Sequence, residues 1–305
     1  MGSKSNATTN RSGFTIVELL VVIVVIAILA VIVVVTYSGV SKQAVVSSLQ
    51  SDLTNAAKQL NLFSTSNDSF PATIDCSTPN STTNKCIKPS SGNILAYLPE
   101  SNDFNLIATN GDNCYSITSR TAPAVGCVKI GNQHWMKTNL NLGTFKTVVS
   151  GAMSSNGQIE KYCYGDIEAN CNLYGGLYQW DEAMGYGVKD ICPAGFHIPS
   201  DGELKTTEIA LNMTQTEADS GAWGRGTDQG KQLRWGGSSG YNAPYGGYWD
   251  RDFGWQYGTF RANYWTSTGS FTTATTRTWM STFDQSYRST SSFKANALSI
   301  RCVKN

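Results

Sequence analysis

The chain has 305 residues, of which 40% are hydrophobic and 15% charged, and its formal net charge is +1 at pH 7. No basic tail or run gathers positive charge to hold phosphates, so charge gives no support to nucleic-acid binding. There are only 2 histidines and no C-x-x-C pair. A zinc site would therefore have few ligands, and we expect neither a metal nor another cofactor.

The first predicted element is an apolar run over 14–35, in which only Thr15 and Glu18 are neither aliphatic nor aromatic. About 20 apolar residues span a bilayer as a helix, so the run predicts a transmembrane segment. Lys4 and Arg11 precede it without any acid, which predicts a cytoplasmic N-terminus and export of the residues after the run. A carboxylate in lipid costs about 2.5 kcal/mol or more, so we expect a charged partner for Glu18.

A small-residue break precedes this run, at Ser12-Gly13. Cleavage after Gly13 would remove the polar leader and create a new amine on Phe14. That amine and the carboxylate of Glu18 on a neighbouring chain could neutralise each other in an apolar bundle. Such a pair would set the axial register of the subunits.

The stretch GFTIVELLVVI, from Gly13 to Ile23, resembles the N-terminus of type IV pilins and pseudopilins. The resemblance includes the short basic leader, the glycine before the cut, and phenylalanine first and glutamate fifth in the mature chain. It implies cleavage after Gly13 by a prepilin peptidase, N-methylation of Phe14, and assembly with other pilin subunits guided by Glu18. A plain signal anchor is the alternative.

The helical period continues beyond the apolar run, as one stripe of apolar residues at spacings of three and four: Val46, Leu49, Leu53, Ala56, Leu60 and Phe63. We expect one helix over 14–63, following a leader at 1–13. A small disulfide-containing pilin head is predicted over 64–130. Its strands are expected at 104–108, 114–118 and 127–130.

The composition changes near residue 130, since all 8 tryptophans lie at or after Trp135. Several segments beyond it, including Cys192–Asp201 and Ser299–Val303, resemble the Fibrobacter-type major paralogous domain. The resemblance implies a C-type lectin-like fold and surface exposure for residues 131–305. Ser200 or Asp201 is expected to begin a helix, and alternation over 298–302 predicts a terminal strand. The predicted class is α+β, with a long N-terminal helix, a small β head and a loop-rich lectin-like domain.

Eight cysteines in an exported segment predict disulfides. Sequence does not fix the connectivity. Local pairing suggests Cys76–Cys86, Cys114–Cys127 and Cys163–Cys171, which leaves Cys192–Cys302.

A cluster of aromatic residues over 241–265 is the candidate ligand surface. We select Tyr248, Trp249, Asp250, Asp252, Trp255 and Tyr257. Exposed aromatic rings stack on sugars or anchor protein contacts. The alternative is that these rings build the core of a loop-rich domain. Calcium could contact the two acids, but two acids this close are common by chance.

Catalysis has little support, since His134 and His197 are expected to be structural and every cysteine has a bridge partner. We therefore expect a filament subunit that displays a lectin-like domain for adhesion to cells, surfaces or glycans, and not an enzyme. It would reside in the bacterial cytoplasmic membrane before assembly and in an extracellular pilus afterwards. One alternative is a minor pilin or pseudopilin for secretion, DNA uptake or twitching motility. Another is a membrane-anchored surface protein or enzyme that does not assemble.

Overall fold

A computed structural model describes residues 16–74, 87–100 and 102–305, with the side chains of 33–39 excepted. The fold is α+β, with an N-terminal helix and a large β-rich domain, and it divides into two compact units, Met1–Ser47 and Ser48–Asn305. The helices of the described residues are α1 (Ile16–Asn67), α2 (Glu168–Tyr174), α3 (Trp180–Ala183), α4 (Asp201–Ala210), α5 (Gln215–Asp219), α6 (Gln229–Leu233) and the 3-10 helices η1 (Val148–Ser150), η2 (Tyr164–Asp166) and η3 (Gly185–Gly187).

Short strands make up most of the remaining regular structure. They are β1 (Ile94–Glu100), β2 (Asp103–Asn110), β3 (Asn113–Thr118), β4 (Ala124–Val125), β5 (Cys127–Ile130), β6 (Gln133–Met136), β7 (Thr144–Phe145), β8 (Glu160–Lys161), β9 (Leu177–Gln179), β10 (Phe196–His197), β11 (Gly224–Arg225), β12 (Tyr248–Asp250), β13 (Gly254–Gln256), β14 (Arg261–Gly269), β15 (Thr273–Met280), β16 (Ser286–Phe293), β17 (Ala297–Ser299) and β18 (Val303–Lys304).

Helix α1 confirms the predicted apolar stripe. Leu49, Leu53, Ala56 and Leu60 are fully buried, and Phe63 is 9% exposed. Residues at these spacings share one helix face, which is why they are buried together. The helix continues to Asn67, a few residues past the predicted end.

The predicted transmembrane span over 14–35 is not confirmed. In the part of the chain that the structure describes, no helix is both long and apolar enough to cross a membrane. Residues 14–15 and the side chains of 33–35 lie outside that part.

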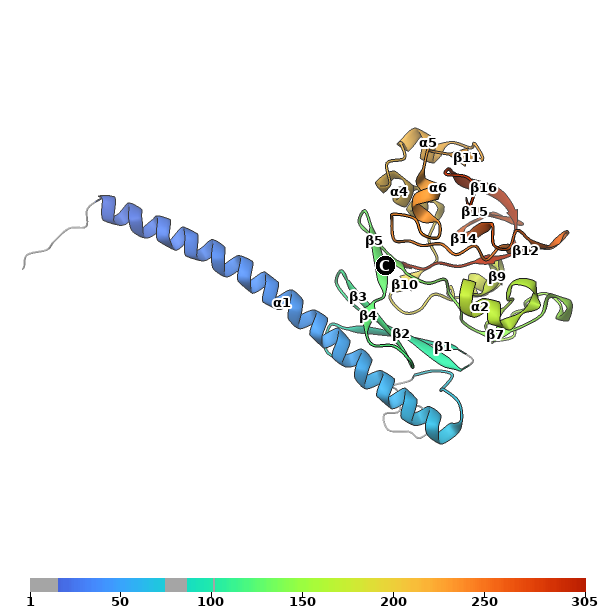
Figure 1. The fold of residues 1–305 in the computed structure, drawn as a ribbon, viewed down its shortest axis with the longest axis horizontal. Coiled ribbons are helices and arrows are strands. Elements are labelled where there is room, and N and C mark those ends of the chain that lie inside the picture. The colour runs from blue at the N-terminus through green and yellow to red at the C-terminus, as the bar shows by residue number, and fades with distance from the viewer. Residues whose placement is uncertain (1–15, 75–86, 101) are drawn as a thin grey trace, which may run out of the picture. The chain divides into compact units, whose positions relative to one another are not determined.

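The first sheet has the antiparallel order β1-β2-β3-β4 (Figure 1). Its strand β2 is buried on both faces. Phe104 lies with its ring centroid 5.1 Å from that of Phe70, whereas Ile107, on the opposite face by alternation, joins a core cluster shared with the C-terminal part. Strands β2 and β3 confirm the predicted strands at 104–108 and 114–118.

The strand at 127–130 exists, but its expected place in the head sheet is wrong. Strand β5 pairs with β6, in a sheet of order β10-β18-β6-β5. The sheet β1-β2-β3-β4, which we call the head sheet, instead includes β1, which the sequence pattern did not predict. The predicted terminal strand is split into β17 and β18, with residues 300–302 outside both.

The largest sheet has the order β11-β16-β15-β14-β17-β12-β13, with β9 pairing with β17. Figure 1 shows helices α4 and α6 beside it, and both contact its strands. Strands β7 and β8 form a small parallel pair, and β8 contacts β9.

One hydrophobic cluster spans the predicted boundary near residue 130. It includes Ala96 and Leu98 of β1, together with Met136, Phe196 and Ile300 of the C-terminal part. Residues of the predicted head and of the predicted lectin-like domain therefore share a core inside the second compact unit.

The described residues form three disulfides, Cys114–Cys127, Cys163–Cys171 and Cys192–Cys302. The first two were suggested by local pairing and the third is the pair that this left, so all three confirm the expected connectivity. The fourth, Cys76–Cys86, lies outside the described residues.

Helix α4 begins where its sequence signal predicts. Ser200 is the N-cap, and a capping box joins its side chain to Glu203. The helix presents two buried acids, Asp201 and Glu208, to arginines of the large sheet. Arg277 Nη1 lies 2.8 Å from Asp201 Oδ1, and its Nε lies 3.0 Å from Glu208 Oε1.

Candidate functional site

The first half of α1 is an apolar surface. The exposed fractions of its large apolar side chains range from 46% at Val24 to 83% at Ile16. Glu18 lies in the first turn of the helix. Gly13 and Phe14, the predicted cleavage and methylation residues, lie outside the described residues. A contiguous apolar surface of this kind marks an interaction with another protein or a membrane.

The predicted ligand surface lies on the β12–β13 hairpin, where Trp249 pairs with Trp255. The Trp249 ring lies 5.7 Å from that of Tyr162, and the Trp255 ring lies 5.3 Å from that of Tyr164, between centroids. Both tryptophans pack against a buried hydrophobic cluster. These two rings therefore contribute to the core, as the alternative interpretation expected.

Asp250 and Asp252 take part in the hairpin turn. Asp250 Oδ1 accepts hydrogen bonds from the backbone N–H groups of Asp252 (2.9 Å) and Phe253 (3.2 Å), and its Oδ2 accepts one from Asn296 Nδ2 (3.1 Å). Asp252 lies 3.3 Å from Arg251 Nε. Across the described ranges, no three His, Cys, Asp or Glu side chains gather in a way that could hold a metal ion.

Tyr248 and Asp250 line a hollow of about 270 Å³ on the large sheet, which we call the sheet hollow. Its lining also includes Trp223, Arg261, Asn263, Thr276, Thr278 and Phe293. Tyr257 lies beside it, with its ring 6.3 Å from that of Tyr248 and 3.6 Å from the guanidinium carbon of Arg261.

The sheet hollow contains an unpartnered donor. Asn263 is 5% exposed, and its Oδ1 accepts a hydrogen bond of 2.7 Å from Thr278 Oγ1. Its Nδ2 has no hydrogen-bond partner among the described residues. Trp223 and Phe293, also in the lining, are 53% and 42% exposed. The polar group can hydrogen-bond to a sugar, and the exposed rings beside it can stack on the sugar ring.

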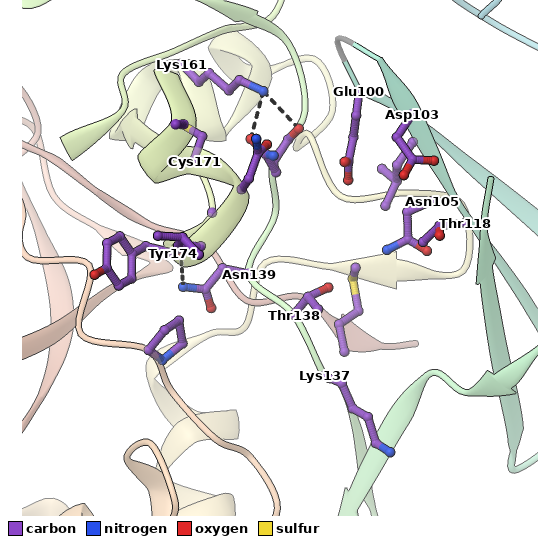
Figure 2. A pocket seen from close by; sticks show the side chains of 18 of the residues that line it. Glu100, Asp103, Asn105, Thr118, Lys137, Thr138, Asn139, Lys161, Cys171 and Tyr174 are labelled. Atoms are coloured by element: carbon purple, nitrogen blue, oxygen red, sulfur yellow. Dashed lines mark hydrogen bonds between the residues drawn. The ribbon is translucent and has the colours of Figure 1, made fainter. Parts of the chain in front are cut away.

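A second and larger cavity, which we call the polar cleft, has a volume of about 750 Å³. Figure 2 shows Glu100, Asp103 and Asn105 on the side of β1 and β2, and Asn139 and Tyr174 across the cavity from them. None of these residues was among the site residues expected from the sequence. They come from segments far apart in the chain, and only the packing of the head sheet on the C-terminal part brings them together.

Charges in the polar cleft are strongly affected by burial. Lys161 is 3% exposed, and its Nζ donates hydrogen bonds to Asn141 O and Asn141 Oδ1 at 3.1 and 2.7 Å. Burial lowers the pKa of Lys161, against the attraction of Glu100 and Glu168. Burial also raises the pKa of Glu100, and the nearby Asp103 adds to that shift while Lys161 opposes it.

His197 has a structural environment. Its Nδ1 lies 2.6 Å from Asn305 Oδ1, and its Nε2 lies 2.7 Å from Glu203 Oε1. Burial lowers the pKa of the imidazole, but the contacts with Asn305 and Glu203 outweigh it, so the pKa is raised. Both ring nitrogens are therefore used in holding β10 against α4 and the C-terminal residue.

Comparison with known protein families matches the part of the chain that contains most of these residues. A family model of the Fibrobacter succinogenes major domain matches residues 128–304, more than half of the chain. The chain belongs to this family. A model of the prokaryotic N-terminal methylation motif matches residues 8–34, which indicates a type IV pilin-like or pseudopilin subunit. No curated protein and no solved structure matches, and the expected C-type lectin-like fold is not confirmed.

Segments of the Fibrobacter succinogenes major domain that are distant in sequence meet beside the polar cleft. Asn139 Nδ2 donates a hydrogen bond of 2.8 Å to Tyr174 O. Gly175 comes next, at φ 84°, and a Cβ there would come within 2.5 Å of the Asn139 side chain, so only glycine fits. Asn139 Oδ1 accepts hydrogen bonds from Tyr264 OH at 2.9 Å and Arg301 Nε at 2.8 Å. These segments of the domain thus form one polar centre.

Proposed function

We propose that this chain is a subunit of a type IV pilin-like filament that displays its Fibrobacter major domain for adhesion. It would be inserted in the cytoplasmic membrane before assembly and reach the cell surface afterwards. The proposal includes the C-type lectin-like relationship expected from the sequence. It treats the protein as a binding protein and not as an enzyme.

One observation carries the filament role: residues 16–34 of the methylation motif lie on a helix, and the large apolar side chains described there are exposed. The motif covers residues 8–34, and large side chains from Ile16 to Ile32 are exposed within it. Lipid before assembly and neighbouring helices after assembly would both cover this surface. Gly13, Phe14 and Glu18 would then serve cleavage, methylation and subunit register, as in the pilins that the motif resembles.

We expect Glu18→Val to prevent incorporation into filaments while membrane insertion persists, because valine suits lipid but cannot pair with the amine of a neighbouring subunit. Immunoblots of sheared filaments and of membrane fractions measure the two steps. Val21→Ile, a neutral change in the same apolar segment, is the control and should assemble normally. Wild-type incorporation of the Glu18→Val chain would refute the filament role of this carboxylate and favour a plain membrane anchor.

The sheet hollow is the surface that we propose for adhesion. We expect Trp223→Ala combined with Phe293→Ala to reduce adhesion of intact filaments by about tenfold or more, since two stacking faces beside Asn263 are lost. Counting cells or beads retained on a glycan-coated surface measures the effect. Phe271→Ala removes a ring that is 96% exposed and is absent from the sheet hollow, so it provides the control.

Point substitutions are preferable to deletion of residues 131–305, because that deletion would expose Leu98 and Ile107 of the shared core. Unchanged adhesion of the double variant, with filaments present in normal amount, would eliminate this surface as the adhesive site. The abundance of the chain in purified filaments separates a major from a minor subunit. A trace amount would favour a minor pilin or pseudopilin of a secretion, DNA-uptake or motility machine.

A non-enzymatic role is supported by how the candidate catalytic groups are used. Both nitrogens of His197 have hydrogen-bond partners. Within the described residues no cysteine is free. A thiol nucleophile is therefore lacking in that part of the chain.

A further inference from the structure

Arg301 is a buried cation whose partners carry no charge. It is 1% exposed, and its Nε donates to Asn139 Oδ1 at 2.8 Å. Its Nη1 donates to the backbone carbonyls of Met136 and Tyr241 at 3.0 and 2.7 Å. Its Nη2 has no hydrogen-bond partner in the described part of the chain. Burying a cation without an anion costs several kcal/mol, so the position is suited to receive one.

Arg301 belongs to the lining of the polar cleft. The Tyr241 ring lies 4.6 Å from its guanidinium carbon, which offsets part of the cost of burial and holds the group in place. Because Asn139 and two backbone carbonyls fix the forked guanidinium group, its remaining N–H groups keep one orientation. A carboxylate oxygen is a strong acceptor for such a donor.

The opposite wall of the polar cleft offers an unpartnered acceptor. Asn105 Oδ1 is buried, and no described residue donates to it. Glu100 and Asp103 lie near it on the same strands (Figure 2). Carboxylate and amide oxygens accept hydrogen bonds from hydroxyl groups, whereas they repel an anion. The part of the ligand between Arg301 and Asn105 should therefore carry a carboxylate at one end and hydroxyl groups at the other.

An aromatic face completes the lining. Trp235 is 54% exposed and lines the polar cleft, and a half-exposed indole can stack on a sugar ring. The volume of about 750 Å³ lies within the range of ligand sites, about 300–1,000 Å³.

We propose that the polar cleft binds an acidic saccharide, with its carboxylate on Arg301, a hydroxyl group donating to Asn105 and a ring on Trp235. This site is separate from the sheet hollow, and binding to it requires neither filament assembly nor adhesion. It gives the chain a second ligand class, uronic-acid-type sugars.

The test is isothermal titration of the purified full chain in detergent micelles with digalacturonate and with galactobiose, the corresponding neutral disaccharide. We expect digalacturonate to bind at least about tenfold more tightly, a difference of about 1.4 kcal/mol. Equal affinities would overturn the proposal, and so would no binding of digalacturonate at about 10 mM. Tighter binding of an acidic dipeptide than of digalacturonate would refute the saccharide class.

Two variants locate the site. Trp235→Ala should weaken digalacturonate binding by about tenfold, whereas Phe271→Ala, which removes an exposed ring that lines neither cavity, should leave it unchanged. Arg301→Lys keeps the charge but loses the fork, and should reduce the preference for digalacturonate over galactobiose. If Arg301→Lys lowers the unfolding midpoint strongly, Asn105→Ala replaces it and should weaken both sugars alike. Equal effects of Trp235→Ala and Phe271→Ala would overturn the assignment.

Discussion

Replacing Glu208 by glutamine is expected to lower the free energy of unfolding by about 3–5 kcal/mol. Glu208 is fully buried, and its carboxylate lies 2.7 Å from Arg225 Nη2 and 3.0 Å from Arg277 Nε. Arg277 retains Asp201 in the variant, but Arg225 loses the anion that pairs with it and becomes a buried cation held by neutral acceptors such as the Ala218 carbonyl. Urea unfolding of the full chain in micelles, followed by tryptophan fluorescence, measures the loss.

Asp284→Asn is the matched control, since it removes one acid from a pair with an arginine at the surface. Asp284 is 49% exposed in its side chain and lies 3.3 Å from Arg234 Nη1. Exposed pairs contribute about 0–1 kcal/mol, so the midpoint should change little. Similar losses in the two variants would show that burial of the Glu208 network adds nothing to stability.

Periodic features of this fold were predictable from sequence. The stripe through Leu49, Leu53 and Leu60 follows the helical period, and packing on one face buried all three. The helix start at Ser200 was also predictable, because a capping box is local and depends on residues three apart. Strands β2 and β3 carry strong apolar and β-branched signals. Strand β1 was missed because it follows a polar, turn-rich segment, although its residues 94–98 are mostly apolar.

The partners of each strand could not be predicted in the same way. Strand β5 was expected in the head sheet, but it continues directly into β6 and pairs with it as a hairpin. The adjacency of β5 and β6 in the chain determined this pairing more strongly than the change of composition near residue 130 did. A domain boundary near residue 130 is hard to draw from composition because the residues on its two sides share one core. Leu98 and Phe196, for example, belong to the same hydrophobic cluster.

The candidate sites were only partly visible in the sequence. The aromatic cluster led to Tyr248 and Asp250, which line the sheet hollow, but Trp249 and Trp255 pack inward. Composition cannot tell a stacking tryptophan from a core tryptophan, because both need the same residue type. The polar cleft depends on Asn105, Asn139 and Arg301, which lie far apart in sequence. Its signal is the buried arginine without an acid, and only the fold reveals it.

Removing the Cys192–Cys302 disulfide should destabilise the chain more than removing Cys163–Cys171. The first bond closes a loop of 110 residues and the second one of 8. In the chain-entropy model these loops correspond to about 4–5 and about 2–3 kcal/mol, since a longer loop restricts the unfolded chain more. Double Cys→Ala variants compare the two bonds fairly, because all four sulfurs belong to buried residues. Urea midpoints under non-reducing conditions give the difference. Equal losses would mean that the Cys192–Cys302 bond acts through local contacts around Cys302 and not by restricting the unfolded chain.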